Sequence, residues 1–394
     1  MNKKALLTAL TIVIVIGLSS TDNATVSVRA NGHIYCVDNF WNAEFTTLGL
    51  EGMHVESLAT TAKYIYAGTT EGLYRKDISQ DTQHKDCIWE FLGFEGETVN
   101  SLYIDPMYPS IIHVGLYINC PINSNGEPHS LFKSINEGQT WKPIDEGIQR
   151  VEQYSFLDED IYIPDTRLPI CCVTAEPGNP KHLYATSYSC IFKSTNGGGT
   201  WNIIWGDPCA LGNGIHTLII DPNNVNNIWA GGESSMYSAI IIKSIDGGNN
   251  WEYITPAMGG DNACYTLAFH PLESNVVYAG MEGKLAKTTD SGVTWDFILS
   301  PPQTPYIRGL VINPIHPNRI YAGGACNTPS APLTIWASNN NGETWDSCSI
   351  DEAEMVRTIV LDPKNPDLLY IGTMGTGVYM CKSINWGPHN YSPE

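Results

Sequence analysis

The segment Ser194-Thr195-Asn196-Gly197-Gly198-Gly199-Thr200-Trp201 decides the fold, because its pattern occurs five times along the chain. The shared pattern is [S/T]-x-[D/N]-x-G-x-[T/N]-W, and we call this eight-residue segment the box. The other four copies begin at Ser134, Ser244, Thr288 and Ser338. Five copies in order, at similar spacing, indicate an architecture built from repeated structural units.

Each position of the box has a role in forming a tight turn. The Asp or Asn side chain accepts backbone N–H groups, the glycine adopts a positive φ, and the Ser or Thr hydroxyl adds a local hydrogen bond. The tryptophan begins the next strand and buries a large ring between sheets. We therefore expect structural and not catalytic roles for Asn136, Asn196, Asp246, Asp290, Asn340, Trp141, Trp201, Trp251, Trp295 and Trp345.

The residues around each box predict a unit of four antiparallel strands. An inner strand such as Ile215-His216-Thr217-Leu218 is followed, in six of seven units, by a turn containing proline such as Asp221-Pro222. A second strand follows, a third enters the box, usually through Lys-Ser, and the tryptophan opens the fourth. Seven units are marked by the tryptophans at positions 89, 141, 201, 251, 295, 345 and 386.

Such sheets bury both faces when they stack radially, so the sequence predicts an all-β, seven-bladed β-propeller of four-stranded antiparallel blades. One domain is expected over 31–394, with blades near 55–93, 99–146, 170–206, 215–256, 264–300, 307–350 and 356–386. Blade 7 ends early in the sequence. We expect the strand 40–48, which contains Trp41, to complete blade 7 and close the ring, which removes exposed sheet edges.

The repeat Asp-Pro…Tyr-Ala-Gly…Lys-Ser-x-Asp-x-Gly-x-x-Trp resembles that of the BNR/Asp-box propellers over nearly all of 31–394. It is similar to the repeats of xyloglucan-degrading endoglucanases, sortilin-type receptor ectodomains and the photosystem II assembly-factor family. The Arg-Ile-Pro of sialidases and the Arg-Thr-Asp-Ile-Gly-Gly of xyloglucanases are absent. The resemblance implies the fold and not the activity. The single-domain, seven-bladed members are closest in size, and they imply a binding or assembly role.

The N-terminus predicts export. Lys3 and Lys4 precede an apolar run from Ala5 to Leu18, which is shorter than the about 20 residues that span a bilayer. We expect a signal peptide over 1–30, cleaved after Ala30, and a periplasmic, cell-surface or secreted protein without a membrane span. An uncleaved anchor is the alternative. Eleven cysteines are typical of disulfides outside the cytoplasm; Cys190 with Cys209 is one reasonable pair, and the neighbours Cys171 and Cys172 are expected to bond elsewhere than to each other.

Charge and motif content exclude several function classes. The net charge of −20 disfavours nucleic-acid binding, because an acidic chain repels phosphate backbones. No C-x-x-C pair occurs, and the acidic run Asp158-Glu159-Asp160 is interpreted as a solvated loop. We therefore expect no metal site and no cofactor.

Topology predicts where a ligand binds. The turns between the first and second strands of a blade, and between its third and fourth, lie on one face and are short here. The long segments, including 118–130, 145–168, 206–214 and 325–333, lie on the other, which we call the loop face. Neutral drift of surface loops is the alternative. At this face, near the axis, the second residue of each inner strand supplies the candidate ligand-binding residues Arg308, Arg357, Tyr265, His216, Asn100 and Glu56.

Arg308 and Arg357 are the most informative of these candidates. Two guanidinium groups in neighbouring blades suit a carboxylate or phosphate. The alternative is that each arginine pairs with a nearby acid and only fills the channel.

Three functions follow. The favoured one is a non-catalytic scaffold that binds a protein segment or glycan. The second is a glycoside hydrolase, which needs two carboxyl groups about 5 to 10 Å apart, from the pool Glu56, Glu233, Asp207, Asp261 and Glu282. The third is a structural subunit of a surface assembly, whose rim neighbouring molecules would bury.

Overall fold

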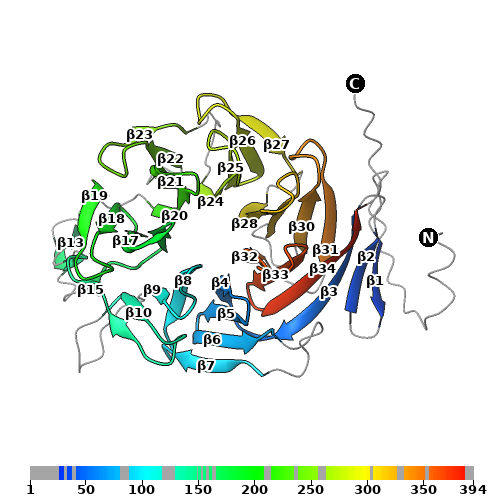
Figure 1. The fold of residues 1–394 in the computed structure, drawn as a ribbon, viewed down its shortest axis with the longest axis horizontal. Coiled ribbons are helices and arrows are strands. Elements are labelled where there is room, and N and C mark those ends of the chain that lie inside the picture. Colours follow the sequence, from blue (N-terminus) through cyan, green and yellow to red (C-terminus); the bar gives the residue numbers. More distant parts are fainter. Residues whose placement is uncertain are drawn as a thin grey trace.

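The computed structural model describes residues 26–30, 33–37, 41–79, 88–117, 129–148, 150–151, 154–156, 159–161, 166–207, 214–234, 238–255, 263–301, 305–325, 332–350 and 355–386. Within these segments all the regular secondary structure is β-strand. Seven sheets, six of four strands and one of six, surround a central axis (Figure 1). This confirms the predicted seven-bladed propeller. The described part of the chain contains no helix with the length and hydropathy that a membrane crossing requires.

In each of blades 1 to 6 the four strands pair in chain order, from the axis outward. Blade 1 contains β4 (Val55–Thr60), β5 (Tyr64–Thr69), β6 (Gly72–Asp77) and β7 (Glu90–Gly93). Blade 2 contains β8 (Thr98–Ile104), β9 (Ile112–Tyr117), β10 (Leu131–Ser134) and β11 (Lys142–Pro143). Blade 3 contains β16 (Cys172–Glu176), β17 (Asn179–Thr186), β18 (Cys190–Ser194) and β19 (Asn202–Gly206).

The other blades follow the same plan. Blade 4 contains β20 (Gly214–Asp221), β21 (Asn224–Glu233), β22 (Ala239–Ser244) and β23 (Glu252–Tyr253). Blade 5 contains β24 (Cys264–Phe269), β25 (Val277–Met281), β26 (Lys284–Thr288) and β27 (Asp296–Leu299). Blade 6 contains β28 (Tyr306–Ile312), β29 (Ile320–Ala325), β30 (Leu333–Ser338) and β31 (Asp346–Ile350). The fourth strand of each box-containing blade begins one residue after the box tryptophan.

Blade 7 is completed by the N-terminal strand, as the sequence predicted. Its sheet has the order β1-β2-β3-β34-β33-β32, formed by β32 (Val356–Leu361), β33 (Leu368–Thr373), β34 (Val378–Trp386) and β3 (Trp41–Gly49). The antiparallel register places Phe45 opposite Cys381 and Trp41 opposite Trp386. Closure of the ring therefore joins the two ends of the chain by main-chain hydrogen bonds.

Two further strands, which the sequence analysis did not predict, extend blade 7 outward. They are β2 (His33–Val37), which pairs with β3, and β1 (Val26–Ala30), which pairs with β2. Cys36 of β2 forms a disulfide with Cys348 of β31 in blade 6, with 5.9 Å between the Cα atoms. Cleavage after Ala30 would remove β1 and leave β2 and the disulfide in place. Cys209 lies outside the described residues, so its pairing with Cys190 stays a prediction.

The box residues form hydrogen bonds within their own turns. In blade 3, Gly198 N donates to Ser194 Oγ at 2.9 Å, and Thr200 N donates to Asn196 Oδ1 at 2.9 Å. Gly198 has a φ of +90°, and a Cβ atom added there would lie 2.6 Å from Ile144 Cδ1 of blade 2. The box glycine therefore serves both the turn and the close approach of the preceding blade.

A basic side chain of one blade reaches the box of the next blade. The donors occupy the same place in the third strand, opposite a buried aromatic or histidine residue of the second strand. The bonds run from Arg75 to Glu137 O, Lys133 to Gly197 O, Lys193 to Gly247 O, Lys243 to Ser291 O and Lys287 to Asn341 O, over 2.8–3.5 Å. We call these five bonds the inter-blade clasps.

The clasps are replaced by other contacts at the two junctions of blade 7. Ala337 and Met380 occupy the donor position in blades 6 and 7, opposite Tyr321 and Tyr370. Blades 6 and 7 are instead joined by the disulfide described above. Between blades 7 and 1, Lys76 Nζ and Trp89 Nε1 both donate to Leu48 O, at 2.9 and 2.8 Å.

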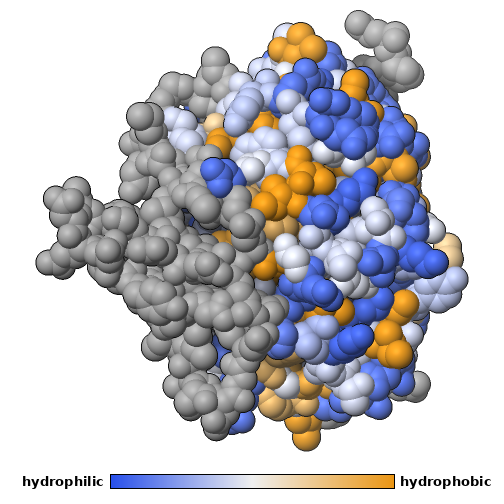
Figure 2. All heavy atoms as spheres, turned by 90° about the vertical axis from the view of Figure 1, so that its left-hand side faces the viewer, coloured by the Kyte–Doolittle hydropathy of each residue, from blue (hydrophilic) through white to orange (hydrophobic). Residues whose placement is uncertain are grey.

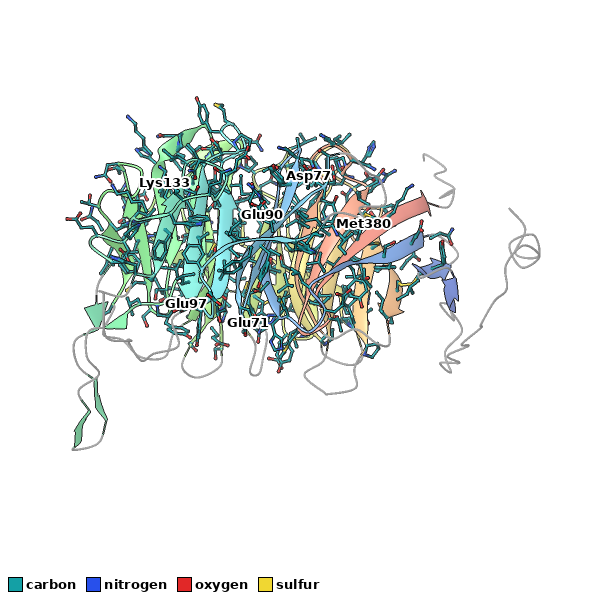
Figure 3. All side chains as sticks on the ribbon, turned by 90° about the horizontal axis from the view of Figure 1, so that it is seen from below. Glu71, Asp77, Glu90, Glu97, Lys133 and Met380 are labelled. Atoms are coloured by element: carbon teal, nitrogen blue, oxygen red, sulfur yellow. A yellow bond between two sulfur atoms is a disulfide. The ribbon has the colours of Figure 1, made fainter. Side chains whose placement is uncertain are left out.

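The side view separates the two faces of the ring (Figure 3). Asp77 and Lys133, which lie next to turns between third and fourth strands, point to one face. Glu71, between β5 and β6, and Glu97, just before β8, lie at the opposite face. The hairpin of β13 (Tyr154–Phe156) and β14 (Glu159–Ile161) projects from that second face, and β12 (Arg150–Val151) pairs with β15 (Thr166–Arg167) at its base. This second face is the loop face.

Candidate ligand site at the channel mouth

A bulge at the start of each inner strand sets the candidate residues apart. In blade 1, Val55 pairs with Thr69 and Ser57 with Gly68, so Glu56 is skipped. A β-bulge bends its strand and redirects the side chain of the extra residue. The same irregularity leaves out Asn100, His216, Tyr265, Arg308 and Arg357.

Blade 3 has the corresponding irregularity at Cys171. Its N–H donates to the carbonyl of Thr186, which is also the partner of Cys172. The bulges therefore bring one residue of every blade to the loop-face end of the innermost strands. We call Glu56, Asn100, Cys171, His216, Tyr265, Arg308 and Arg357 the mouth ring.

Arg357 is paired with an acid of the neighbouring blade. Its Nε donates to Glu56 Oε2 at 2.8 Å, and its Nη2 donates to the same oxygen. The Glu56 side chain is only 9% exposed, so the ion pair is largely shielded from water. Arg357 thus matches the alternative in which an arginine is neutralised inside the ring.

Arg308 is in a different situation. Its Cζ lies 4.0 Å from the centroid of the Tyr265 ring, a cation–π contact. Among the described residues no carboxylate lies within ion-pair distance of Arg308, and its buried Nε has no hydrogen-bond partner. Burial, and then the positive charge of Arg357, lower the pKa of Arg308 to about 10, so it still carries a charge at neutral pH.

Aromatic residues continue the ring beside Arg308. Tyr265 stacks on His216, with 5.7 Å between the ring centroids, and its edge contacts Tyr306 at 5.6 Å. Further round the loop face, the hydroxyl groups of Tyr188 and Tyr117 are hydrogen-bonded. Tyr306, Tyr188 and Tyr117 were not among the ligand-binding residues predicted from the sequence. Tyr306 immediately precedes the strand predicted from Ile307, and the structure includes it in β28.

The other side of the ring is occupied by internal contacts. Asn100 Nδ2 donates to the carbonyls of Ile170 and Cys171, at 3.2 and 3.4 Å. Cys171 and Cys172 are free thiols, so the expectation that they bond to other cysteines is wrong. Burial raises the pKa of Cys171 to about 12, which keeps its thiol protonated and weakly nucleophilic. These contacts leave Arg308 as the ring's cation without an acidic partner in the described structure.

Two of the carboxyl groups proposed for hydrolysis, Glu56 and Glu233, are poorly matched to acid catalysis. Glu56 is held by Arg357, and Glu233 Oε1 lies 3.5 Å from His216 Nε2. The contact with His216 lowers the pKa of Glu233, whereas a general acid needs a raised one. Asp261 lies outside the described residues, and so do 118–128, 208–213 and 326–331 of the long loops and the side chains of the acidic run at 158–160.

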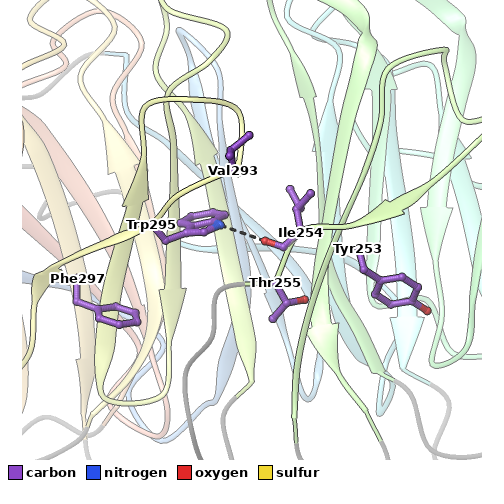
Figure 4. A pocket seen from close by; sticks show the side chains of 7 residues that line it. Tyr253, Ile254, Thr255, Val293, Trp295 and Phe297 are labelled. Carbon is purple, nitrogen blue, oxygen red and sulfur yellow. Dashed lines mark hydrogen bonds between the residues drawn. The ribbon is translucent and has the colours of Figure 1, made fainter.

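A separate cavity lies away from the mouth ring, between the outer strands of blades 4 and 5 (Figure 4). It has a volume of about 470 Å³ and is lined by Tyr253, Ile254, Thr255, Gly292, Val293, Trp295 and Phe297. The Trp295 indole spans the two blades and donates to Ile254 O at 3.0 Å. No cluster of three or more potential metal ligands occurs among the residues that the structure describes.

Comparison with known proteins supports the fold. No family model and no curated protein matches the chain. Among solved structures, a GH74 enzyme of Niastella koreensis is 20% identical with a TM-score of 0.64, and the match covers 86% of this chain and 54% of that enzyme. A GH74 xyloglucanase from Xanthomonas campestris is 16% identical with a TM-score of 0.62, and the match covers 86% of this chain and 53% of that enzyme.

The protein YCF48, solved bound to a D1 peptide, is 16% identical with a TM-score of 0.59, and the match covers 87% of this chain and 97% of that one. This chain therefore spans about half the length of the two GH74 enzymes and nearly the whole of YCF48. At these identities the likeness concerns the fold alone, and what it establishes is that the chain is a seven-bladed β-propeller.

Proposed function

We propose that this protein is an exported, non-catalytic binding scaffold that holds a protein segment or glycan on its loop face, with an anionic group of the ligand at the mouth ring. The observation behind the proposal is Arg308, a partly buried guanidinium with no acidic partner among the described residues. A rigid ring that presents such a group is suited to binding, because little ordering is needed when the ligand arrives.

Two further observations support the scaffold and its location. The disulfide between Cys36 and Cys348 is typical of proteins outside the cytoplasm. YCF48, a propeller of similar extent, was solved with a bound peptide, so this architecture can hold a protein segment. The D1 peptide is a partner of YCF48, and a protein segment or glycan as partner of this chain is part of our proposal.

An affinity pull-down from the envelope and extracellular fractions tests the proposal. The bait is the wild-type protein, compared with Arg308→Ala and with the Arg308→Ala/Arg357→Ala double variant. Arg319→Ala is the matched control, because Arg319 pairs with Asp367 between two turns of the face opposite the loop face. Thermal melting of each bait comes first, since loss of Arg357 leaves Glu56 without its partner.

A partner retained by wild type and by Arg319→Ala, but lost by Arg308→Ala, supports the proposal. A partner held equally by all four baits moves the site away from the mouth ring. The absence of any specific partner argues against the scaffold and favours the second function, hydrolysis of glycans.

Hydrolysis of glycans is the second candidate function, because GH74 enzymes share this fold. A hydrolase reading requires that extracellular polysaccharides are cleaved by wild type and that cleavage is lost when two of Glu56, Glu233, Asp207, Asp261 and Glu282 are replaced one at a time by the corresponding amide. The structure favours the scaffold, because Glu56 is neutralised and the pKa of Glu233 is lowered.

The third reading, a structural subunit, depends on the outer rim. On the side of the ring shown in Figure 2, apolar residues form small patches among hydrophilic ones. Tyr253 and Phe297, beside the cavity between blades 4 and 5, are 67% and 40% exposed. Protection of this rim from solvent labelling in the native envelope, with the loop face still accessible, would favour the structural reading over the scaffold.

A further inference from the structure

The order of residues around the mouth ring shows what Arg308 lacks. Arg357 of blade 7 receives its counter-ion from the next position of the ring, Glu56 of blade 1. For Arg308 of blade 6, the next position is Arg357, another cation, and the preceding one is Tyr265, which offers only its ring face. In blade 6, Arg308 therefore lacks, among the described residues, the one carboxylate that Glu56 supplies to Arg357 of blade 7.

We propose that the mouth ring binds one carboxylate group of its ligand at Arg308, in the role that Glu56 has for Arg357. This inference rests on the proposed binding function and specifies the ligand chemistry of the same site. Glu56 is then an internal counterpart of the ligand, and the two neighbouring arginines form one filled and one open site for the same planar group.

Geometry and charge favour a carboxylate over a phosphate. The Cζ atom of Arg308 lies 4.0 Å from the centroid of the Tyr265 ring. The N–H groups of a guanidinium lie in its plane, where a planar carboxylate can accept two of them. The negative charges of Glu56 and Glu233 both act on Arg308. Together they balance the charges of Arg308 and Arg357, so the second charge of a dianion gains little attraction there. The net charge of −20 on the whole chain repels a dianion about twice as strongly as a monoanion.

The test is isothermal titration calorimetry of the full mature protein with small probes. D-Glucuronate presents a carboxylate on a sugar, and N-acetylglycine presents one at the end of a peptide unit. D-Glucose is the neutral match, and inorganic phosphate is the competing anion. We expect saturable 1:1 binding of at least one carboxylate probe, with glucose and phosphate at least tenfold weaker. The tighter of the two carboxylates identifies the source of the group.

Three variants locate the bound carboxylate. Arg308→Gln is expected to weaken the carboxylate probe at least tenfold, and Arg308→Lys, which keeps the charge without the planar fork, at least threefold. Arg319→Gln is expected to bind as wild type does. Glu56→Gln releases Arg357, and we expect two carboxylates to bind per chain in place of one. Should Arg308→Gln fail to fold, as judged by its melting curve, Arg308→Lys and Glu56→Gln decide the question.

Several results would overturn the inference: equal affinity for glucuronate and glucose, tighter binding of phosphate than of both carboxylates, unchanged affinity in the folded Arg308 variants, or a single bound carboxylate in Glu56→Gln. Its failure differs from failure of the scaffold. Carboxylate binding without a retained partner would remove the scaffold and keep the site, whereas an Arg308-dependent partner without carboxylate binding would do the reverse.

Discussion

Lys193 donates a hydrogen bond from Nζ to the carbonyl oxygen of Gly247, 2.8 Å away in the box of the next blade. The same clasp recurs four times, over sequence separations of 48 to 64 residues. Ala337 and Met380 stand in the donor position of the two blades whose successor lacks a box. A basic residue is therefore present where an acceptor turn exists next door, which makes the clasp a property of pairs of blades.

Lys193→Met tests the clasp with the residue that blade 7 itself has at this position. We expect a loss of about 1.5–3 kcal/mol in the free energy of unfolding, the usual contribution of a hydrogen bond from a charged donor. Urea unfolding measures it. The control is Lys181→Met in the same blade, where the lysine is exposed. Equal stability of the two variants would show that the clasp contributes nothing.

His113 predicts an acid sensitivity of folding. It occupies the second-strand position that holds a buried tyrosine or tryptophan in the other six blades, and neither ring nitrogen has a hydrogen-bond partner. Burial, and then the charge of Lys133, lower its pKa from 6.5 to about 3. Between these values the unfolded chain binds the proton and the folded chain does not, so stability falls as the pH is lowered through this window.

His113→Phe removes that proton-linked loss. The loss amounts to about 1.4 kcal/mol per pH unit, or about 2 kcal/mol at pH 5 relative to pH 7. We expect the variant to be at least as stable as wild type at pH 7 and to lose correspondingly less on acidification, measured by urea unfolding at both pH values. The exposed His316→Phe is the control. An identical pH dependence in wild type and His113→Phe would refute this account.

Gly198→Ala separates backbone strain from packing between blades. The substitution imposes a side chain at a φ of +90° and forces a Cβ atom to 2.6 Å from Ile144. Gly178 of the same blade has a φ of +78° with open space around it, so Gly178→Ala measures the strain alone, about 1 kcal/mol. We expect thermal or urea unfolding to show a further 1–3 kcal/mol for Gly198→Ala. Equal losses of stability in the two variants would mean that Ile144 of blade 2 moves aside at no cost in free energy.

The disulfide is expected to stabilise the closed ring. Cys36 and Cys348 are separated by 312 residues, and cross-links over long loops restrict the unfolded chain most. We expect Cys36→Ser/Cys348→Ser to lose about 3–5 kcal/mol. A thiol reductant should lower the melting temperature of wild type to that of the variant, without lowering the variant itself. A reductant-insensitive wild type that melts with the variant would contradict this.

The sequence was sufficient for the repeat, the blade number and the closing strand, because each depends on local patterns. The box defines a turn by itself, and Trp41 begins a strand that blade 7 lacks. The position of the mouth-ring residues also followed from strand order. The partners of Arg308 and Arg357 did not, because they depend on which bulge residue stands in the adjacent blade and how the two side chains turn.

Contacts between blades were equally hidden. The Lys-Ser that enters most boxes was visible in the sequence, but its acceptor belongs to a turn about one repeat further on, which requires the angle between sheets. Cys36 was overlooked as a partner for Cys348, since β1 and β2 have no counterpart in the repeat. These residues form contacts between neighbouring blades, which cannot be predicted from the sequence of one blade.

The bond between Cys36 and Cys348 also determines how the protein responds to mechanical load. Backbone and disulfide form one covalent hoop that contains all of blades 1 to 6 up to β31, together with β3. Tension applied at the two chain ends passes through the sulfur bridge and bypasses that hoop. Only the segments outside it bear the pull: the residues before Cys36 at one end, and those after Cys348, including β32 to β34, at the other. An anchored molecule would thus extend by peeling blade 7 while the inner strands of the other six blades keep their arrangement.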